Sequence, residues 1–222
     1  MRRKVLLVNG EVYHIFNRSI ADFVIFNDSD EYERMWQLIK YYQTENELKY
    51  SVFIRSKRVE KEDFNNFFNS IIQNKEKIVQ IIAYCLMPTH FHLILKQYKN
   101  DGISNYIRKI LESYSSYFNA RHKRRGPLWE SKFKIVLVEK DEQLLHLTRY
   151  IHLNSVTDKL VNKPEDWFFS SYREYVNKVK DNSAVCQFEN ILEINPNTYD
   201  KFVNNQIAYQ RELAKIKNLL IE

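Results

Sequence analysis

Two histidines separated by one residue, His90 and His92, lie in the apolar run MPTHFHLIL (residues 87–95). Alternate residues of a β-strand point to the same face, so on a strand the two imidazoles would lie roughly 7 Å apart on one face. Imidazole is a common metal ligand, and two rings at this spacing could bind one divalent ion. The alternative is a pair of partly buried strand residues bonded to the backbone, and the pattern alone does not separate the two interpretations.

A polar stripe on the helix predicted over residues 141–156 supplies further candidates. Its members recur at spacings of three and four residues, which places them along one side of a helix: Gln143, His146 (or Leu147), Tyr150 and Asn154. Asn154 could offer a third donor atom to a metal that Tyr150 also approaches. His146 is a candidate proton acceptor for Tyr150, with a solvent-facing position as the alternative, and a polar stripe of this kind also occurs on helices that only face water.

Hydrophobic periodicity predicts the elements that must position these residues. The predicted strands cover residues 11–19, 50–55, 79–87, 90–96 and 131–139. The predicted helices cover residues 28–43, 61–78, 103–122 and 141–156, the last with Asp141 as its N-cap. Short turns join neighbouring strands and no regular βαβ alternation occurs, so we expect an α+β fold, an antiparallel sheet with helices packed on it. A polar stretch at 177–187 predicts a linker between a domain of residues 1–176 and a helical tail of residues 188–222.

Composition excludes several classes of protein. Glycine occurs only at Gly10, Gly102 and Gly126, so the chain has no Walker loop, no dinucleotide-binding fingerprint and no G-x-S-x-G elbow. Its two cysteines, Cys85 and Cys186, have no metal-ligand spacing, which favours a reducing compartment. The four apolar residues before Asn9 are too few for a secretory signal, and no run approaches a membrane span. We therefore expect a cytoplasmic protein.

Positive charge is concentrated in one stretch. The whole chain has 34 Lys and Arg against 28 Asp and Glu, a net charge of +6, and residues 101–140 hold nine of these cations against four acids, a net +5. Basic side chains neutralise nucleic-acid phosphates, and neighbouring aromatic rings (Tyr114, Tyr117, Phe118 and Trp129) could stack on bases. The alternative is a solvated helix end whose cations complement the helix dipole.

Five segments, in this order along the chain, give the sequence a resemblance to a known family: YHIFNRS, AYCLMPTHFHLIL, YFNARHKRRGPLWESKFK, YIHLNSV and WFFSSYREY. Over roughly residues 11–176 the chain resembles the single-tyrosine HUH transposases, which are IS200-like proteins, and within them the REP-associated tyrosine transposase branch. Two positions depart from the commoner pattern: Thr89 stands where Asn or an acid is usual, and Ser155 where Pro is usual.

The resemblance implies a ferredoxin-like HUH nuclease core and a specific chemistry. His90 and His92 would bind Mg²⁺ or Mn²⁺ together with Asn154, and Tyr150 would be the nucleophile that cuts and rejoins single-stranded DNA bearing hairpins. The residues expected to bind the nucleic acid are Arg18, Arg108, Lys109, Arg121, Lys123, Arg124, Arg125 and Lys132. Relatives include dimers that exchange catalytic helices, so a homodimer is one expectation, and no membrane partner is expected.

Three alternatives stay open at this point. If Tyr150 is not the nucleophile, Tyr106, Tyr114 and Tyr117 are the rival tyrosines. A second function is a domesticated, catalytically weak protein that only binds hairpin nucleic acid, although His90, His92 and Tyr150 are all present. A third, a metal hydrolase with an H-x-H strand, would need more histidines and a longer alternating βα chain than this sequence has.

Overall fold

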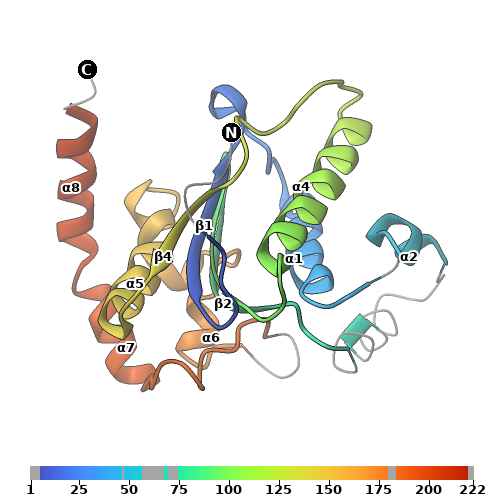
Figure 1. The fold of residues 1–222 in the computed structure, drawn as a ribbon. Coiled ribbons are helices and arrows are strands. Elements are labelled where there is room, and N and C mark those ends of the chain that lie inside the picture. Colours follow the sequence, from blue (N-terminus) through green and yellow to red (C-terminus); the bar gives the residue numbers. More distant parts are fainter. Residues whose placement is uncertain (1–5, 47, 57–67, 70–74, 180–183, 220–222) are drawn as a thin grey trace.

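The computed structural model describes residues 6–46, 48–56, 68–69, 75–179 and 184–219. A four-stranded antiparallel sheet with the strand order β2-β3-β1-β4 lies at its centre. The strands are β1 (Val12–Arg18), β2 (Val79–Met87), β3 (His90–Gln97) and β4 (Lys134–Val138). Helices cover both faces of this sheet (Figure 1), which confirms the predicted α+β architecture.

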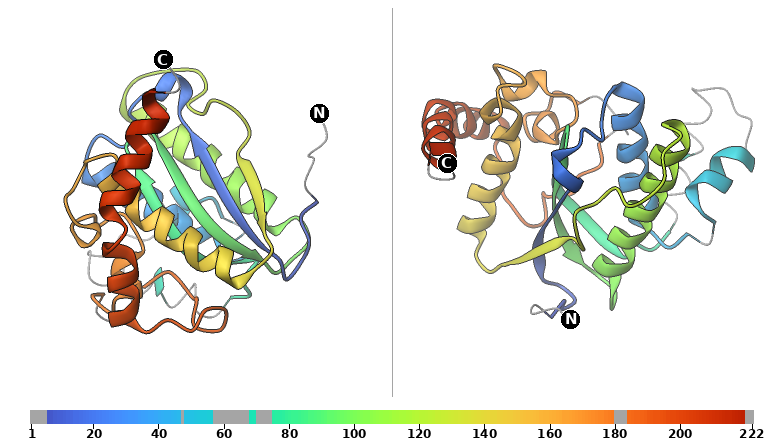
Figure 2. Two further views of the ribbon diagram at one scale, coloured as in Figure 1. Left: turned by 90° about the vertical axis from the view of Figure 1, so that its left-hand side faces the viewer. Right: turned by 90° about the horizontal axis from the view of Figure 1, so that it is seen from above.

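The helices form two layers. On one side of the sheet lie α1 (Ser29–Tyr42), α2 (Tyr50–Ser56) and α4 (Gly102–Arg121). On the other side lie α5 (Asp141–Thr157), α6 (Tyr172–Tyr175), α7 (Pro196–Asn204) and α8 (Ile207–Leu219), as Figure 2 shows from two directions. Across the described residues, no helix is both long and apolar enough to cross a membrane.

Strand register places the two histidines on the face that α5 covers. In the antiparallel pairing of β1 with β3, Phe16 is opposite His92 and Arg18 is opposite His90. Residues opposite each other share a face of the sheet. Because alternate residues of a strand also share a face, His14 joins this group from β1.

The opposite face also packs into the apolar core. Phe91, Leu93 and Leu95 are fully buried there, and α4 packs against β2 and β3. The buried residues of α4 recur at helical spacing: Ile103, Tyr106, Ile107, Ile110, Tyr114 and Phe118. The Tyr106 hydroxyl donates to the carbonyl oxygen of Ile39 at 2.9 Å, which ties α4 to α1.

Residues 50–55 form helix α2, where the sequence predicted a strand. Tyr50 and Phe53, three residues apart, are 1% and 5% exposed, whereas Val52 between them is 44% exposed. The buried positions therefore follow the helical period. A short aromatic and β-branched run does not reveal that period until its packing partners are known.

The helix predicted over residues 61–78 lies mostly outside the described residues. Within it, residues 68–69 are helical, whereas residues 75–78 lead into β2 without forming a helix. The amide of Ile78 donates instead to the carbonyl oxygen of Gln43 at 2.9 Å.

The helix starts follow local chemistry, with one correction. The Asp28 carboxylate caps α1 by accepting a bond from the amide of Glu31 at 3.1 Å, as the acidic start of the predicted helix indicated. Asp141 is not the N-cap of α5, because Lys140 occupies that position and Asp141 is the first helical residue. The Asp141 carboxylate still complements the positive end of the helix dipole.

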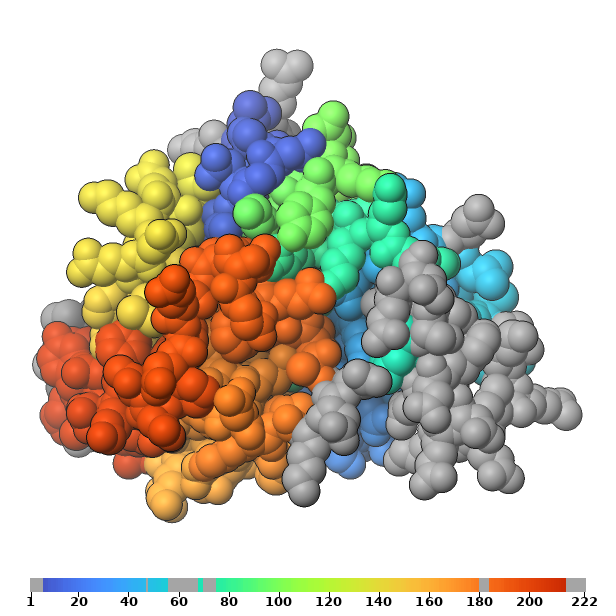
Figure 3. All heavy atoms as spheres, turned by 90° about the horizontal axis from the view of Figure 1, so that it is seen from below, coloured from blue at the N-terminus to red at the C-terminus, as the bar shows by residue number. Residues whose placement is uncertain are grey.

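The chain after α6 packs against the preceding structure. Val185 and Cys186 are buried, and their amides donate to the Glu174 carboxylate at 2.9 Å and 2.7 Å. Helices α7 and α8 pack on α5, and the C-terminal segments, orange to red, cover much of the underside of the molecule (Figure 3). Residues 184–187, part of the predicted linker, are thus integrated into the fold, while the predicted division into domains stays a prediction.

Candidate active site

His90, His92 and Tyr150 meet at one pocket of about 320 Å³. The two histidines reach it from the start of β3, and Tyr150 reaches it from the middle of α5. The rest of the lining comes from β1, from β4 and from the segment before β4: Phe16, Asn17, Arg18, Glu130 and Lys134. The histidine pair and Tyr150, which come from two separate features of the sequence, therefore share one pocket.

In both imidazoles, Nδ1 lies within hydrogen-bond distance of a neighbouring side chain. Their ring centroids are 5.2 Å apart and their planes are nearly perpendicular, at 86°. Nδ1 of His90 lies 3.1 Å from Oγ1 of Thr89, and Nδ1 of His92 lies 2.9 Å from Nε2 of His14. In the described part of the structure, Nε2 of either ring has no hydrogen-bond partner. Metal-binding histidines commonly show this arrangement, in which one ring nitrogen is bonded to a neighbouring side chain and the other is free.

Burial keeps the three histidines of this face neutral. It lowers the pKa of His14 and of His90 to about 4, and for His90 the nearby Arg18 guanidinium adds to the effect. The pKa of His92 lies well below its ordinary value, first because of burial and then because of His14, His90 and Arg18. A neutral imidazole has a lone pair available for a metal, so these rings are in the form that a ligand needs.

Two imidazoles and one amide are the candidate donors for the metal that the resemblance implies. Asn154 lies on α5 one turn after Tyr150, is 8% exposed, and has a buried Nδ2 atom without a hydrogen-bond partner. It is not part of the pocket lining. No cluster of three or more His, Cys, Asp or Glu residues suited to a metal occurs among the described residues. The two imidazoles with a free Nε2 fit an open site, in which phosphate oxygens or water would fill the other positions of a bound ion.

Tyr150 is the tyrosine that lines this pocket. Its ring meets the ring of His92 edge-on, with the centroids 5.9 Å apart, and 41% of the residue is exposed. Burial raises the pKa of the Tyr150 phenol, and the negative charge of Asp158 adds to this effect. The phenol is therefore protonated at neutral pH and must lose its proton when it acts as a nucleophile.

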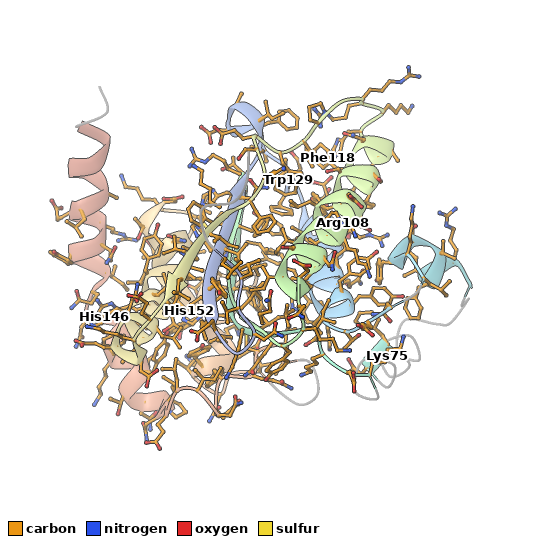
Figure 4. The ribbon with its side chains drawn as sticks, viewed as in Figure 1. Lys75, Arg108, Phe118, Trp129, His146 and His152 are labelled. Carbon is orange, nitrogen blue, oxygen red and sulfur yellow. The ribbon has the colours of Figure 1, made fainter. Side chains whose placement is uncertain are left out.

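The rival tyrosines and the predicted base lie elsewhere. Tyr106 and Tyr114 are fully buried, with hydroxyls donating to backbone carbonyl oxygens on the other side of the sheet. Tyr117 lines a different hollow. His146 is exposed, lies within hydrogen-bond distance of Arg149 (2.9 Å) and contacts Phe202, so it is outside the pocket (Figure 4).

His14, Glu130 and Lys134 have places in or beside the pocket that the sequence did not predict. His14 stacks on His92 with the centroids 5.2 Å apart, and Glu130 and Lys134 are part of the lining. Alternation within β1 puts His14 and Arg18 on one face, but only the pairing of β1 with β3 brings that face to the H-x-H strand. Lys134 and Glu130 appeared in the sequence only as members of the basic stretch.

The predicted nucleic-acid contacts fall into separate groups. Arg18 lines the pocket, 3.6 Å from Asp22, and Arg108 and Lys109 line a hollow on α4. Arg121 pairs with Asp28 at 2.7 Å and also donates to the Tyr117 hydroxyl, so it holds helices together.

The remaining predicted cations follow α4. Arg124 donates to Asn119 and lies over the rings of Phe23 and Phe118, which gives it a structural role. Lys123, Arg125 and Lys132 are exposed.

Two of the aromatic residues suggested for base stacking, Tyr114 and Phe118, are part of the core, and a third, Trp129, packs against it. Tyr114 and Phe118 are 0% and 1% exposed, and Trp129 packs on Phe91 and donates to Ser115 at 3.0 Å (Figure 4). Their positions on an amphipathic helix and beside a strand made them inward-facing. The suggestion that they stack on bases is therefore wrong for the buried Tyr114 and Phe118, and it stays a prediction for the partly buried Trp129.

A family comparison agrees with the resemblance. The model of IS200-like transposases matches residues 40–154, which is more than half of the 222-residue chain and includes His90, His92, Tyr150 and Asn154. The chain belongs to this family.

Two individual proteins are similar to it. One, from Haemophilus influenzae and named as a REP-associated tyrosine transposase, is 25% identical over 107 residues, which are 44% of this chain and 61% of that protein. The chain thus spans less than two thirds of that relative's length. The other is the solved structure of a REP-associated tyrosine transposase bound to a REP hairpin, with 16% identity and a TM-score of 0.55 over 87% of this chain and 99% of that one. This likeness shows that the two chains share a fold.

Proposed function

We propose that this chain is a metal-dependent endonuclease and strand transferase for single-stranded DNA next to hairpins, with Tyr150 as its nucleophile. The observation that carries the proposal is the meeting of Tyr150 and the two imidazoles of His90 and His92 in one pocket of one chain. The structurally similar transposase was solved bound to a REP hairpin, which supports hairpin DNA as the kind of substrate.

The chemistry is an exchange of two phosphate esters. The Tyr150 phenol oxygen attacks a phosphodiester, a new phosphorus–oxygen bond forms to the tyrosine, and the bond to the 3′ oxygen breaks. The products are a 5′-phosphotyrosine and a free 3′-OH, which takes up a proton. Attack by another 3′-OH reverses the step at a new junction, so the covalent intermediate conserves the bond energy and no nucleotide hydrolysis is needed.

The pocket residues take separate roles in this step. A divalent ion, Mg²⁺ or Mn²⁺, held by His90 and His92 with Asn154 as a candidate third donor, would polarise the phosphate and stabilise the leaving oxygen. The cations of Arg18 and Lys134 lie where they can neutralise the phosphate. Glu130 is the carboxylate of the lining, and we propose it as the group that accepts the phenol proton.

One chain supplies both halves of the proposed site. Tyr150 lies against His92 of its own chain, and α7 and α8 pack on the helix that carries it. We therefore favour action within one chain over exchange of α5 between two subunits, and a homodimer of unexchanged subunits is compatible with this arrangement.

Covalent capture tests the proposal. The purified chain is incubated with Mg²⁺ or Mn²⁺ and a labelled hairpin that carries single-stranded extensions from the DNA next to its own gene, and the products are separated on a denaturing gel. We expect a metal-dependent protein–DNA band that is absent in Tyr150→Phe and present in Tyr209→Phe, because Tyr209 lies exposed on α8. A band that survives Tyr150→Phe would contradict the assignment, and tight hairpin binding without any band would favour the binding-only alternative.

A further inference from the structure

A second charged hollow lies on the other side of the sheet from the tyrosine pocket. It measures about 660 Å³ and lies between α1, α2 and α4. Five cationic side chains line it: Arg34, Lys49, Arg55, Arg108 and Lys109. Among its described lining residues the one carboxylate, Glu112, pairs with Arg108 at 3.2 Å. This lining therefore carries five positive charges against one negative charge, a net +4.

Aromatic rings hold part of this charge in place. The Arg34 guanidinium lies over the rings of Tyr50 and Tyr117, at 5.0 Å and 4.7 Å from their centroids. The Lys109 ammonium lies 5.9 Å from the ring of Tyr42. Such contacts restrict long side chains, so less freedom is lost when an anion binds. Figure 4 shows Arg108 on the side of α4 that faces α2.

Like charges gathered in one hollow repel each other, so an anion that enters it relieves an existing cost. The pattern fits phosphodiesters better than a carboxylate ligand, because several separate cations can neutralise successive phosphates of one backbone. The hollow lies away from Tyr150, so the bound phosphates are not those that the tyrosine attacks.

We propose that this hollow binds the sugar–phosphate backbone of the base-paired stem, while the unpaired strand enters the tyrosine pocket. The proposal rests on the proposed action on hairpin DNA. The strand at Tyr150 has to be unpaired to reach the pocket, so the stem needs a separate surface. The exposed Lys123 and Arg125 lie in the turn after α4, and the chain from this turn crosses to the β4 side of the sheet (Figure 1). Their positive charges lie on the connection between the two sides of the sheet.

Equilibrium binding with two matched variants tests the proposal. The double variant Lys49→Gln/Lys109→Gln removes two charges from the hollow. The control Lys163→Gln/Lys201→Gln removes two exposed lysines from the other side of the sheet. Fluorescence anisotropy is measured with a labelled hairpin that carries a single-stranded extension and with the extension alone, over a range of salt concentrations.

We expect the hollow variant to bind the hairpin at least about tenfold more weakly than the control. The slope of log affinity against log salt concentration should also be shallower by about 1.8, because each of the two lost phosphate contacts contributes about 0.9 to that slope. Binding of the extension alone should stay unchanged. Equal hairpin affinity in both double variants would overturn the proposal, as would an equal loss for the extension alone.

A third arm separates DNA from a free nucleotide as the source of phosphate. If dAMP binds the wild-type chain and this binding is lost in the hollow variant while hairpin affinity is kept, the hollow is a nucleotide site and the proposal fails. No hairpin binding by the wild-type chain would overturn both this proposal and the proposed function, whereas hairpin binding that is insensitive to the hollow variant overturns this one alone.

We also infer, from a separate observation, that His14 fixes the tautomer of His92. The 2.9 Å contact joins Nε2 of His14 to Nδ1 of His92. Both residues are buried, with 9% and 7% of their surface exposed. When His92 carries its proton on Nδ1 and donates it to His14, Nε2 of His92 has a free lone pair. His14 is then a positioning residue for a proposed metal ligand.

The tautomer is measurable without a metal. Nitrogen-15 NMR of the imidazoles in the metal-free chain should show His92 protonated at Nδ1. His14→Phe keeps the stacked ring but removes the acceptor, so the Nδ1–H signature should be lost and Mn²⁺ affinity should fall about 10–100-fold. His14→Gln restores an acceptor and should recover both readouts. A wild-type His92 protonated at Nε2, or a Mn²⁺ affinity unchanged in His14→Phe, would overturn the inference.

Discussion

Two clusters that contain histidine lie on different sides of α5, and their histidines use the ring nitrogens differently. In the pocket, His90 and His92 each bond through Nδ1 and leave Nε2 free of partners among the described residues. On α5 itself, His152 is fully buried and both of its ring nitrogens have partners. The Tyr199 hydroxyl lies 2.7 Å from Nδ1 and the Ser171 Oγ lies 2.8 Å from Nε2. A neutral imidazole is common to both clusters, so neutrality alone does not indicate chemistry. The difference that points to chemistry is a ring nitrogen that has no partner and belongs to a residue lining a pocket.

The second cluster has the composition of a nucleophile–base pair but not its access. Ser171 is fully buried, and its Oγ also accepts from the Tyr84 amide at 2.9 Å. The Tyr199 hydroxyl on α7 donates onward to Thr148 at 2.9 Å. These bonds join α5 to β2 and to α7, so the cluster secures the helix whose other side presents Tyr150.

The largest expected effect is at the pocket tyrosine. Tyr150→Phe removes the attacking oxygen while keeping the ring that contacts His92, so the covalent protein–DNA band should disappear and the melting temperature should stay within about 2 °C. Gel analysis and thermal unfolding measure the two effects on the same preparation. If Tyr150→Phe lost the band because the variant unfolds, the role of Tyr150 would be structural, and its assignment as a chemical group of the pocket would be contradicted.

Next comes the loss of a free imidazole. His90→Ala or His92→Ala should lower Mn²⁺ affinity and band formation by at least about a hundredfold, because one of two imidazole donors is removed. Isothermal titration and rates of band formation report this. His146→Ala on the outer side of α5 is the matched control, and an equal loss there would show that any histidine of this region gives the same effect.

His152→Ala should give the reverse pattern. It removes a fully buried side chain and two hydrogen bonds, so the free energy of unfolding should fall by about 3 kcal/mol. Mn²⁺ affinity, measured well below the unfolding transition, should change less than about twofold. Denaturant unfolding with a metal titration distinguishes the two clusters, and weakened metal binding without a loss of stability would reverse their assigned roles.

The smallest effect is the dependence of stability on pH. Burial lowers the pKa of His152 to about 3 from 6.5, so between these values the unfolded chain binds a proton that the folded chain does not. The contribution of the neutral His152 to the free energy of unfolding is therefore complete above pH 6.5. It is lost as the pH falls, by about 2 kcal/mol between pH 7 and pH 5. Between pH 7 and pH 5, the free energy of unfolding of the wild type should fall by about 2 kcal/mol more than that of His152→Asn. Parallel curves would contradict the burial of a neutral imidazole.

Local periodicity was enough to predict much of the site. Alternation in β3 placed His90 and His92 on one face, and the spacing of Tyr150 and Asn154 placed both on one side of α5. The α+β class and most element positions also followed from patterns within a few residues. These features depend on backbone geometry that repeats every two or 3.6 residues, so a short stretch of sequence determines them.

Tertiary structure alone decided which of these faces meet. The register of β1 against β3 brought His14 to His92, and the path of the chain before β4 brought Glu130 to the same pocket. Packing also made residues 50–55 a helix and turned Tyr114 and Phe118 inward. The basic residues were divided between two sides of the sheet in the same way. Contacts between residues distant in sequence depend on register and on burial against other elements, so they form only when the whole sheet and its two helical layers are assembled.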